Sequence, residues 1–129
     1  MREIKFRVWY KKERFMEDLT WPFAIIDNEQ VFDLRTGREL SSDVEILQYT
    51  ESKDKNGKEI YEGDIVSGWI SDIEHDKLLS VGKIMFVDGA FGIFSISNNF
   101  IGDLSSCTLN KSIKIIGNVY ENPELFKLK

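Results

Sequence analysis

Alternation of apolar and polar side chains along short segments is the feature that most constrains the fold. Near the start of the chain, every second position carries a bulky apolar side chain: Ile4, Phe6, Val8 and Tyr10. A side-chain period of two is typical of a strand with one buried face. The alternation recurs over 44–49, and further strand-like segments occupy 23–26, 30–34, 65–70, 83–87, 90–96 and 113–120. The pattern predicts a mostly β protein built on a small, bent antiparallel sheet.

Turn residues separate these segments. Asn56-Gly57 and Asp88-Gly89 each have the composition of a type I′ hairpin turn, in which both central residues take a positive φ. Asp27-Asn28-Glu29 is a further candidate turn. Glycines within or beside strand segments, such as Gly68 and Gly92, predict a bulge, a bend or a close backbone approach.

Helical patterning is scarce. Asn122 suits a helix N-cap and Pro123 the first helical position, which predicts a short C-terminal helix within 123–129. One or two helical turns would also fit 72–79 and 102–109.

Length and composition favour one domain, spanning residues 1–129. The chain is 42% hydrophobic, with no apolar run near the roughly 20 residues of a membrane helix. The N-terminal segment lacks the apolar stretch and cleavage site of a signal peptide. The single cysteine, Cys107, excludes an internal disulfide and suits a reducing compartment. We therefore expect a cytoplasmic location and no membrane partner.

Basic charge is concentrated at the start of the chain. Residues 1–14 carry six basic and two acidic side chains, whereas residues 15–64 carry five basic and thirteen acidic ones, and the net charge is -5. A basic segment can contact phosphate groups. Strict alternation, however, predicts that Lys5 and Arg7 form the solvent-exposed face of a strand.

The sequence offers little for catalysis or metal binding. A structural zinc site needs four ligands, mostly Cys or His, and the chain has one of each, Cys107 and His75. The same two residues are the only Cys–His pair available to a nucleophilic mechanism. Glu62 and Asp64 would share one face of a strand, as an acid–base pair could, but such pairs arise by chance among 22 acidic residues. We expect no enzymatic activity, no cofactor and no metal.

Aromatic side chains beside basic ones raise the alternative of nucleic-acid binding. Small β-barrels stack bases on exposed rings next to a basic groove. Trp9 is the most suggestive ring because it shares a strand face with Arg7. The candidate binding residues are Arg7, Trp9, Tyr49 and Trp69, with Trp21 as a further ring. The acidic residues of 15–64 would repel a phosphate backbone, which disfavours this alternative.

Three segments of the chain resemble the YopX family. The longest is 48–66, QYTESKDKNGKEIYEGDIV, and the others are 4–9, IKFRVW, and 116–125, IGNVYENPEL. They occur in the family's order and frame nearly the whole chain. Two details differ from the family's pattern: Tyr10 stands where an acidic residue is common, and Glu51-Ser52 replaces the usual Gly-Leu.

The resemblance implies a mainly β fold with a barrel-like core. It also implies a small protein of bacteriophages and prophages, mainly in Gram-positive bacteria, without an established biochemical role. The segment 62–66 has the composition of a sharp turn into a core strand, as at the entry of an SH3-like barrel, so its role is expected to be structural.

The first functional hypothesis is therefore a phage or prophage accessory protein in the host cytoplasm. It would be a non-enzymatic module that binds a host or phage protein or associates with itself. Its expected mark is a contiguous exposed apolar patch that includes Trp9, Trp21 or Trp69. The alternative is a nucleic-acid-binding small β-barrel that uses the basic N-terminal strand and exposed aromatic rings. An enzyme comes third, because no group of residues supplies both a nucleophile and its base. Its expected mark is a deep pocket holding a carboxylate with a strongly shifted pKa.

Overall fold

The structure is a computed structural model that describes residues 4–26, 30–71, 76–95, 100–104 and 113–126. Within these ranges it contains twelve antiparallel strands in three sheets and one short 3-10 helix. The elements are β1 (Phe6–Tyr10), β2 (Phe15–Asp18), β3 (Phe23–Ile26), β4 (Gln30–Asp33), β5 (Arg38–Glu39), β6 (Val44–Lys53), β7 (Glu59–Tyr61), β8 (Asp64–Ser71), β9 (Asp76–Val87), β10 (Ala90–Phe94), β11 (Phe100–Asp103), β12 (Ile113–Asn118) and η1 (Pro123–Phe126). The prediction of a mostly β fold is confirmed.

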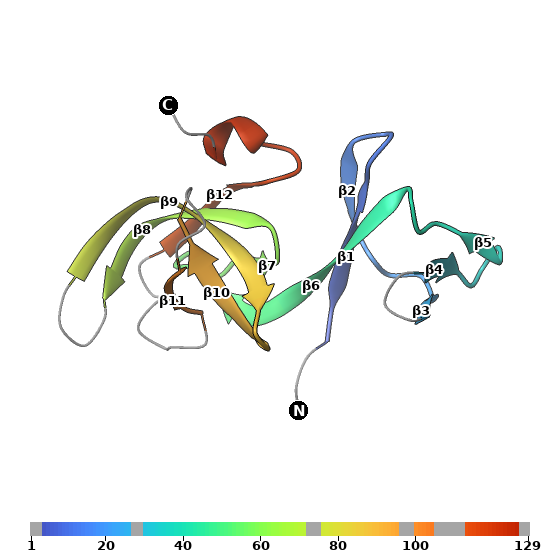
Figure 1. Ribbon diagram of the computed structural model, residues 1–129, viewed down its shortest axis with the longest axis horizontal. Helices are drawn as coiled ribbons and strands as arrows, with labels where there is room; N and C mark the ends of the chain where they lie inside the picture. The colour runs from blue at the N-terminus through green and yellow to red at the C-terminus, as the bar shows by residue number, and fades with distance from the viewer. Residues whose placement is uncertain (1–3, 27–29, 72–75, 96–99, 105–112, 127–129) are drawn as a thin grey trace.

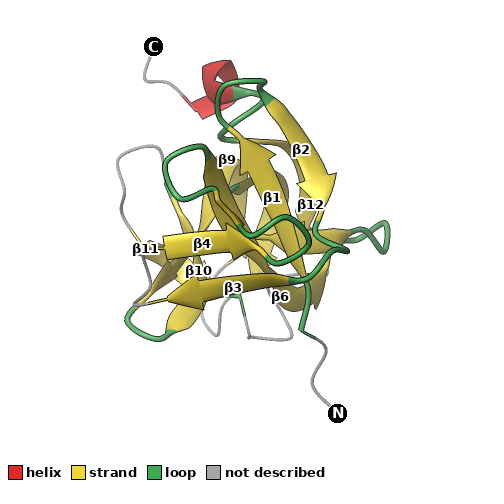
Figure 2. Cartoon of the chain, turned by 90° about the vertical axis from the view of Figure 1, so that its right-hand side faces the viewer, coloured by secondary structure: helices red, strands yellow, loops and turns green. Residues whose placement is uncertain are grey.

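The N-terminal half of the molecule, β1–β6, is built on a four-stranded sheet with the order β2-β1-β6-β7. A smaller sheet, β3-β4-β5, lies against it, and Figure 2 shows β3 and β4 in front of β1 and β6. Apolar side chains fill the space between the two sheets. This core consists of Val8, Trp21, Val31, Leu40 and Val44.

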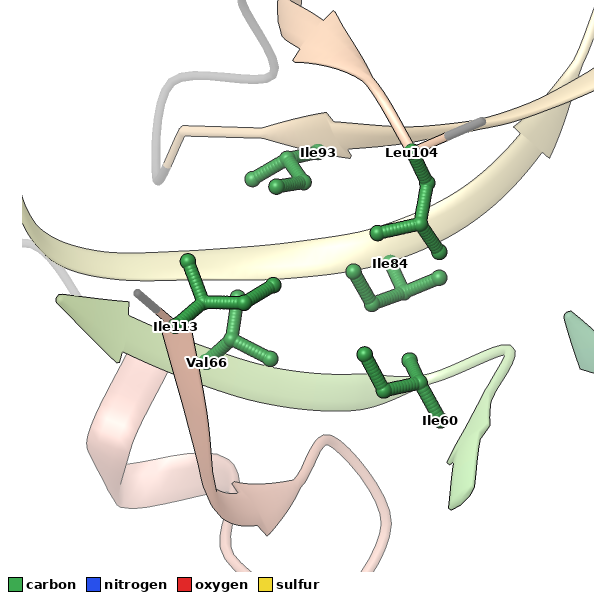
Figure 3. Packing of buried hydrophobic residues seen from close by; sticks show 6 residues of the cluster. All are labelled: Ile60, Val66, Ile84, Ile93, Leu104 and Ile113. Atoms are coloured by element: carbon green, nitrogen blue, oxygen red, sulfur yellow. The ribbon is translucent and has the colours of Figure 1, made fainter. Parts of the chain in front are cut away.

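The C-terminal half, β7–β12, is built on a curled five-stranded sheet with the order β11-β10-β9-β8-β12, whereas β7 itself pairs with β6 at the edge of the N-terminal sheet. It surrounds a second core of buried aliphatic side chains, which Figure 3 shows from close by. This core consists of Ile60, Val66, Ile84, Ile93, Leu104 and Ile113. The curled sheet gives this half its barrel-like form, and the long strand β6 runs between the two halves (Figure 1).

Two helical expectations are wrong where the structure describes them. Residues 76–79 belong to β9, which pairs with β8, and Gly102 and Asp103 belong to β11, which pairs with β10. Pairing with a neighbouring strand therefore overrides the local composition. Residues 72–75 and 105–109 lie outside the described residues. The C-terminal helix is confirmed as one short 3-10 turn, Pro123–Phe126.

The two predicted type I′ turns differ in outcome. Asp88 and Gly89 have φ values of 53° and 81°, as a type I′ turn requires. At Asn56-Gly57 only the glycine has a positive φ, 81°. The Gly57 amide donates to the Asp54 carbonyl at 2.9 Å and the Asp54 amide donates to the Lys58 carbonyl at 2.8 Å. This is a longer loop that ends in a left-handed glycine, so the type I′ assignment is wrong here.

The carboxylate of Asp54 explains the longer loop. One oxygen accepts hydrogen bonds from the amides of Asn56 and Lys58, both at 2.9 Å. The other oxygen accepts the amide of Ile115 in β12 at 3.0 Å. The side chain therefore shapes the loop and also attaches it to the C-terminal sheet.

We expect Asp54 to make the stability of the protein sensitive to acid. Burial raises the pKa of this carboxyl, but the amides of Ile115, Lys58 and Asn56 outweigh burial and hold the pKa below its ordinary value of 3.8. A lowered native pKa contributes stability that is complete above pH 3.8 and is lost as the pH falls through the native value. Urea unfolding from about pH 5 to pH 2.5 should therefore show a steeper loss of stability in the natural protein than in Asp54→Asn. Asp43→Asn controls for removal of a carboxylate, and parallel profiles for the natural protein and Asp54→Asn would contradict the expectation.

Candidate functional site

Three of the sequence-predicted site residues lie where the two halves of the molecule meet. Trp9 and Tyr49 are only 4% and 3% exposed. The Trp9 ring packs on Tyr120 with centroids 5.7 Å apart, and the Tyr49 ring packs on Tyr61 at 5.5 Å. The expectation of exposed rings at these positions is wrong, because β1 and β6 have neighbours on both faces. The side chain of Trp69, in β8, lies outside the described residues.

Trp21 is also buried. Its side chain is 8% exposed and belongs to the N-terminal core. Its indole Nε1–H donates to Glu17 at 3.2 Å. The expected patch centred on tryptophan is therefore absent at Trp9 and Trp21.

Arg7 is paired within the protein rather than presented to solvent, so its expected place on a solvent-exposed strand face is wrong. Its Nη2 lies 2.5 Å from Oδ1 of Asp64, and the two side chains are 12% and 2% exposed. Its guanidinium also lies over the Tyr61 ring, 4.7 Å from the centroid. Its Nε is buried and has no hydrogen-bond partner among the described residues. We call Arg7, Trp9, Asp64, Tyr61 and Tyr120 the junction. Because these residues connect the two halves, we assign the junction a structural role.

Asp64 in the junction and Glu62 beside it have displaced pKa values. Burial raises the pKa of Asp64, and the attraction of Arg7 and the bond from the Tyr61 amide offset this only in part. Burial also raises the pKa of Glu62, whose Oε1 accepts the amide of Gln48 at 2.9 Å. Both carboxylates thus have partners within the protein, and this arrangement fits a structural role.

Burial raises the pKa of Tyr120 to about 12. It lines a hollow of about 290 Å³ together with Glu62 and Gly63. Gly63 has a φ of 85°, and a Cβ atom there would lie 2.8 Å from Cε2 of Tyr120. The expectation that 62–66 forms a turn into a core strand agrees with this geometry.

No group of His, Cys, Asp and Glu side chains suited to a metal ion occurs in the described part of the chain. His75 and Cys107 lie outside that part. Among the same residues, no helix is long and apolar enough to cross a membrane.

An exposed apolar surface that sequence reasoning missed lies on β9, β10 and β11, which neighbour one another in the C-terminal sheet. On this surface Phe100 is 63% exposed and Val87 39%. The Phe94 and Phe100 rings pack edge to face at 5.6 Å. The sequence contained a signal, since four of the nine phenylalanines fall within residues 86–100.

The register shows which side chains share a face. Val87 lies opposite Ala90, and Met85 lies opposite Gly92. Because side chains alternate along a strand, these residues occupy the face of the sheet opposite the core residues Ile84 and Ile93.

A hollow of about 310 Å³ opens on this outer face. The hollow is lined by Val87, Asp88, Ala90, Phe91, Gly92, Phe94 and Phe100, and Asp88 is the one charged residue among these seven. Gly92 forms its floor, where an added Cβ atom would lie 2.9 Å from Cε2 of Phe100. We call this site the aromatic hollow, and its size and lining suit one apolar side chain of a partner.

Comparisons with known proteins agree with the architecture. A family model described as YopX protein matches residues 5–127. The crystal structure of protein EF1440 from Enterococcus faecalis is similar over 98% of this chain and 100% of that one, with 27% sequence identity and a TM-score of 0.66. The crystal structure of protein yopX from Bacillus subtilis is similar in fold over 95% of this chain and 98% of that one, with 24% identity and a TM-score of 0.58. A search of curated proteins found no match. The extent of the family match, nearly the whole chain, shows that this protein belongs to the YopX family.

Proposed function

We propose that this protein is a non-enzymatic binding module that engages another protein through the aromatic hollow. The single observation that carries the proposal is an apolar hollow of about 310 Å³ whose wall includes Phe100, with 63% of its surface exposed. Leaving a phenylalanine side chain in water costs roughly 1.5–3 kcal/mol relative to burying it. A partner that covers Phe100 would recover much of this free energy.

The binding of nucleic acid is less well supported by the same geometry. The rings offered for base stacking at positions 9 and 49 are buried, and Asp64 pairs with Arg7. The net charge of -5 adds repulsion of phosphate groups. Binding of a protein at the aromatic hollow requires neither exposed rings at positions 9 and 49 nor a free Arg7.

The proposal can be tested by site-specific photo-cross-linking in bacterial cells that produce the chain. A photoreactive phenylalanine analogue is placed at Phe100, with Leu34 as the control, because Leu34 is 56% exposed and lies in the N-terminal half. We expect a discrete protein adduct from position 100 and none from position 34. Identical adducts from both positions, or no adduct, would overturn the proposal. Adducts that nuclease removes would support the nucleic-acid alternative instead.

We propose further that the protein works in the cytoplasm of a bacterial host, encoded by a phage or prophage. Its resemblance to the YopX family supports this origin. The same cells serve as the test: fractionation should recover the photo-adduct with the cytoplasmic proteins, and recovery in another fraction would contradict the location.

A further inference from the structure

We infer that a hollow at the start of β1 binds an organic cation, namely an ammonium or guanidinium group carried on a hydrocarbon stem. This hollow, which we call the β1 hollow, has a volume of about 460 Å³. Sites for small ligands typically have volumes of about 300–1,000 Å³. The β1 hollow shares no lining residue with the aromatic hollow, so the inference is independent of the proposed function.

One part of the lining is apolar and comes from the N-terminal half: Ile4, Phe6, Leu19 and Phe23. The Phe6 and Phe23 rings pack edge to face with centroids 5.5 Å apart. The side chain of Ile4 remains 65% exposed. A hydrocarbon stem in the hollow would cover this apolar surface, and removing it from water is favourable.

The polar part of the lining contains a hydroxyl without a partner. Tyr61, in β7, lines the hollow and is only 7% exposed. Its ring packs on Tyr49 with centroids 5.5 Å apart, and its centroid lies 4.7 Å from the Arg7 guanidinium. Within the described residues the Tyr61 hydroxyl makes no hydrogen bond, although most buried polar groups have one. The N–H of a bound cation can supply this bond by donating to the hydroxyl oxygen.

The polar part also carries a negative charge that has no counter-ion. Glu59 forms an ion pair with Lys5 at 2.6 Å, whereas Asp18 has no ion-pair partner in the described ranges. Arg7 lies opposite Asp18 in the register of β1 and β2, but its guanidinium pairs with Asp64. An unpaired carboxylate attracts a cation and repels an anion.

The hydroxyl and the carboxylates lie near enough to one another to contact the same ligand group. Burial raises the pKa of Tyr61, and the negative charges of Glu59 and Asp18 raise it further. The hydroxyl therefore stays protonated at neutral pH and lies within the field of both carboxylates. A cation placed there offsets the charge of Asp18, while its stem lies on the apolar part of the lining.

Nuclear magnetic resonance titration of the full chain with phenylpropylamine tests the inference. We expect saturable shifts in the amide signals of residues that line the β1 hollow, with a dissociation constant of about 1 mM for a ligand of this size. Phenylpropionate has nearly the same size and the opposite charge, and it should cause no such shifts up to about 20 mM.

Two substitutions connect the binding to named groups. Asp18→Asn removes the unpaired charge and Tyr61→Phe removes the hydroxyl, and each should raise the dissociation constant of phenylpropylamine about threefold or more. Asp88→Asn is the matched control, because Asp88 is also exposed but lines the aromatic hollow. It should leave the dissociation constant unchanged. Thermal unfolding of each variant verifies that it is folded.

A capped tripeptide with arginine between two leucines distinguishes two sources of the cation. Binding of this peptide would assign the hollow to a basic side chain of another protein, and binding of the amine alone would assign it to a free amine. The absence of saturable shifts with either probe would overturn the inference. Equal binding of phenylpropionate would also overturn it, as would binding of phenylpropylamine that Asp18→Asn and Tyr61→Phe leave unchanged.

Discussion

Asp64→Ala is expected to lower the free energy of unfolding by about 3–5 kcal/mol, because it leaves a buried charge without its partner. The side chain of Arg7 is only 12% exposed, and the Asp64 carboxylate is the acidic group that contacts it. The same substitution also removes the acceptor of the Tyr61 amide. Chemical denaturation in urea measures the loss.

Asp43→Ala is the matched control. Asp43 pairs with Arg38 at 3.3 Å, but the two side chains are 46% and 69% exposed, so a loss of about 0–1 kcal/mol is expected. The double variant Arg7→Met/Asp64→Asn removes both charges and keeps an acceptor for the Tyr61 amide. Its loss of unfolding free energy should therefore be smaller than the summed losses of Arg7→Met and Asp64→Asn measured separately. Equal losses for Asp64→Ala and Asp43→Ala would refute the role of the junction.

The junction also bears on the division of the chain into domains. Arg7 belongs to the N-terminal half and Asp64 to the C-terminal half. We propose that residues 1–129 form one domain that unfolds in a single transition, since neither half can separate without breaking this pair. Two resolved transitions in calorimetry of the natural protein would contradict the proposal.

The second large effect is expected at Gly63. Gly63→Val should lower the free energy of unfolding by about 3–5 kcal/mol, from a strained positive φ and from overpacking. The φ of 85° disfavours any β-branched residue, and the new Cβ atom would lie 2.8 Å from the Tyr120 ring. That ring packs on Trp9 and has little freedom to move away.

Gly57→Val separates the two causes. Gly57 has a φ of 81°, close to that of Gly63, but no atom lies within 4 Å of its ideal Cβ position. Only the backbone strain remains there, and a loss of about 1–3 kcal/mol is expected. If the two glycine variants unfold at the same urea concentration, the contact with Tyr120 contributes nothing.

The prediction of strands succeeded where alternation and turn residues agreed, and it failed for strands without a local signal. The segment that contains β1 was predicted because apolar residues recur at every second position. Neither β2 nor β5 was predicted: β2 has one partly buried residue, and β5 has two exposed residues. These strands form because β1 and β4 offer them hydrogen-bonding edges. Such edges are a property of the folded chain rather than of the local sequence.

The prediction of site residues failed for a related reason. Alternation indicated correctly that Arg7 and Trp9 share one strand face, but a period of two does not tell which face is covered. In the folded chain both faces of β1 are covered: β8 brings Asp64 and the segment after β12 brings Tyr120 to the face of Arg7 and Trp9, and Val8 on the other face belongs to the N-terminal core. Conversely, the run 90–96 was assigned only to a strand, and the register with β9 and β11 was needed to show the aromatic hollow.

The sequence alone determined the mostly β class, the principal strands, the glycine-dependent turns and the resemblance to the YopX family. These follow from local causes, namely the alternation of side chains and the φ range that glycine allows. Tertiary structure alone decided which aromatic rings are buried, which carboxylate neutralises Arg7 and where apolar surface remains exposed. Those outcomes depend on contacts between residues far apart in the sequence, such as Arg7 and Asp64, which are 57 positions apart, and no local pattern encodes them.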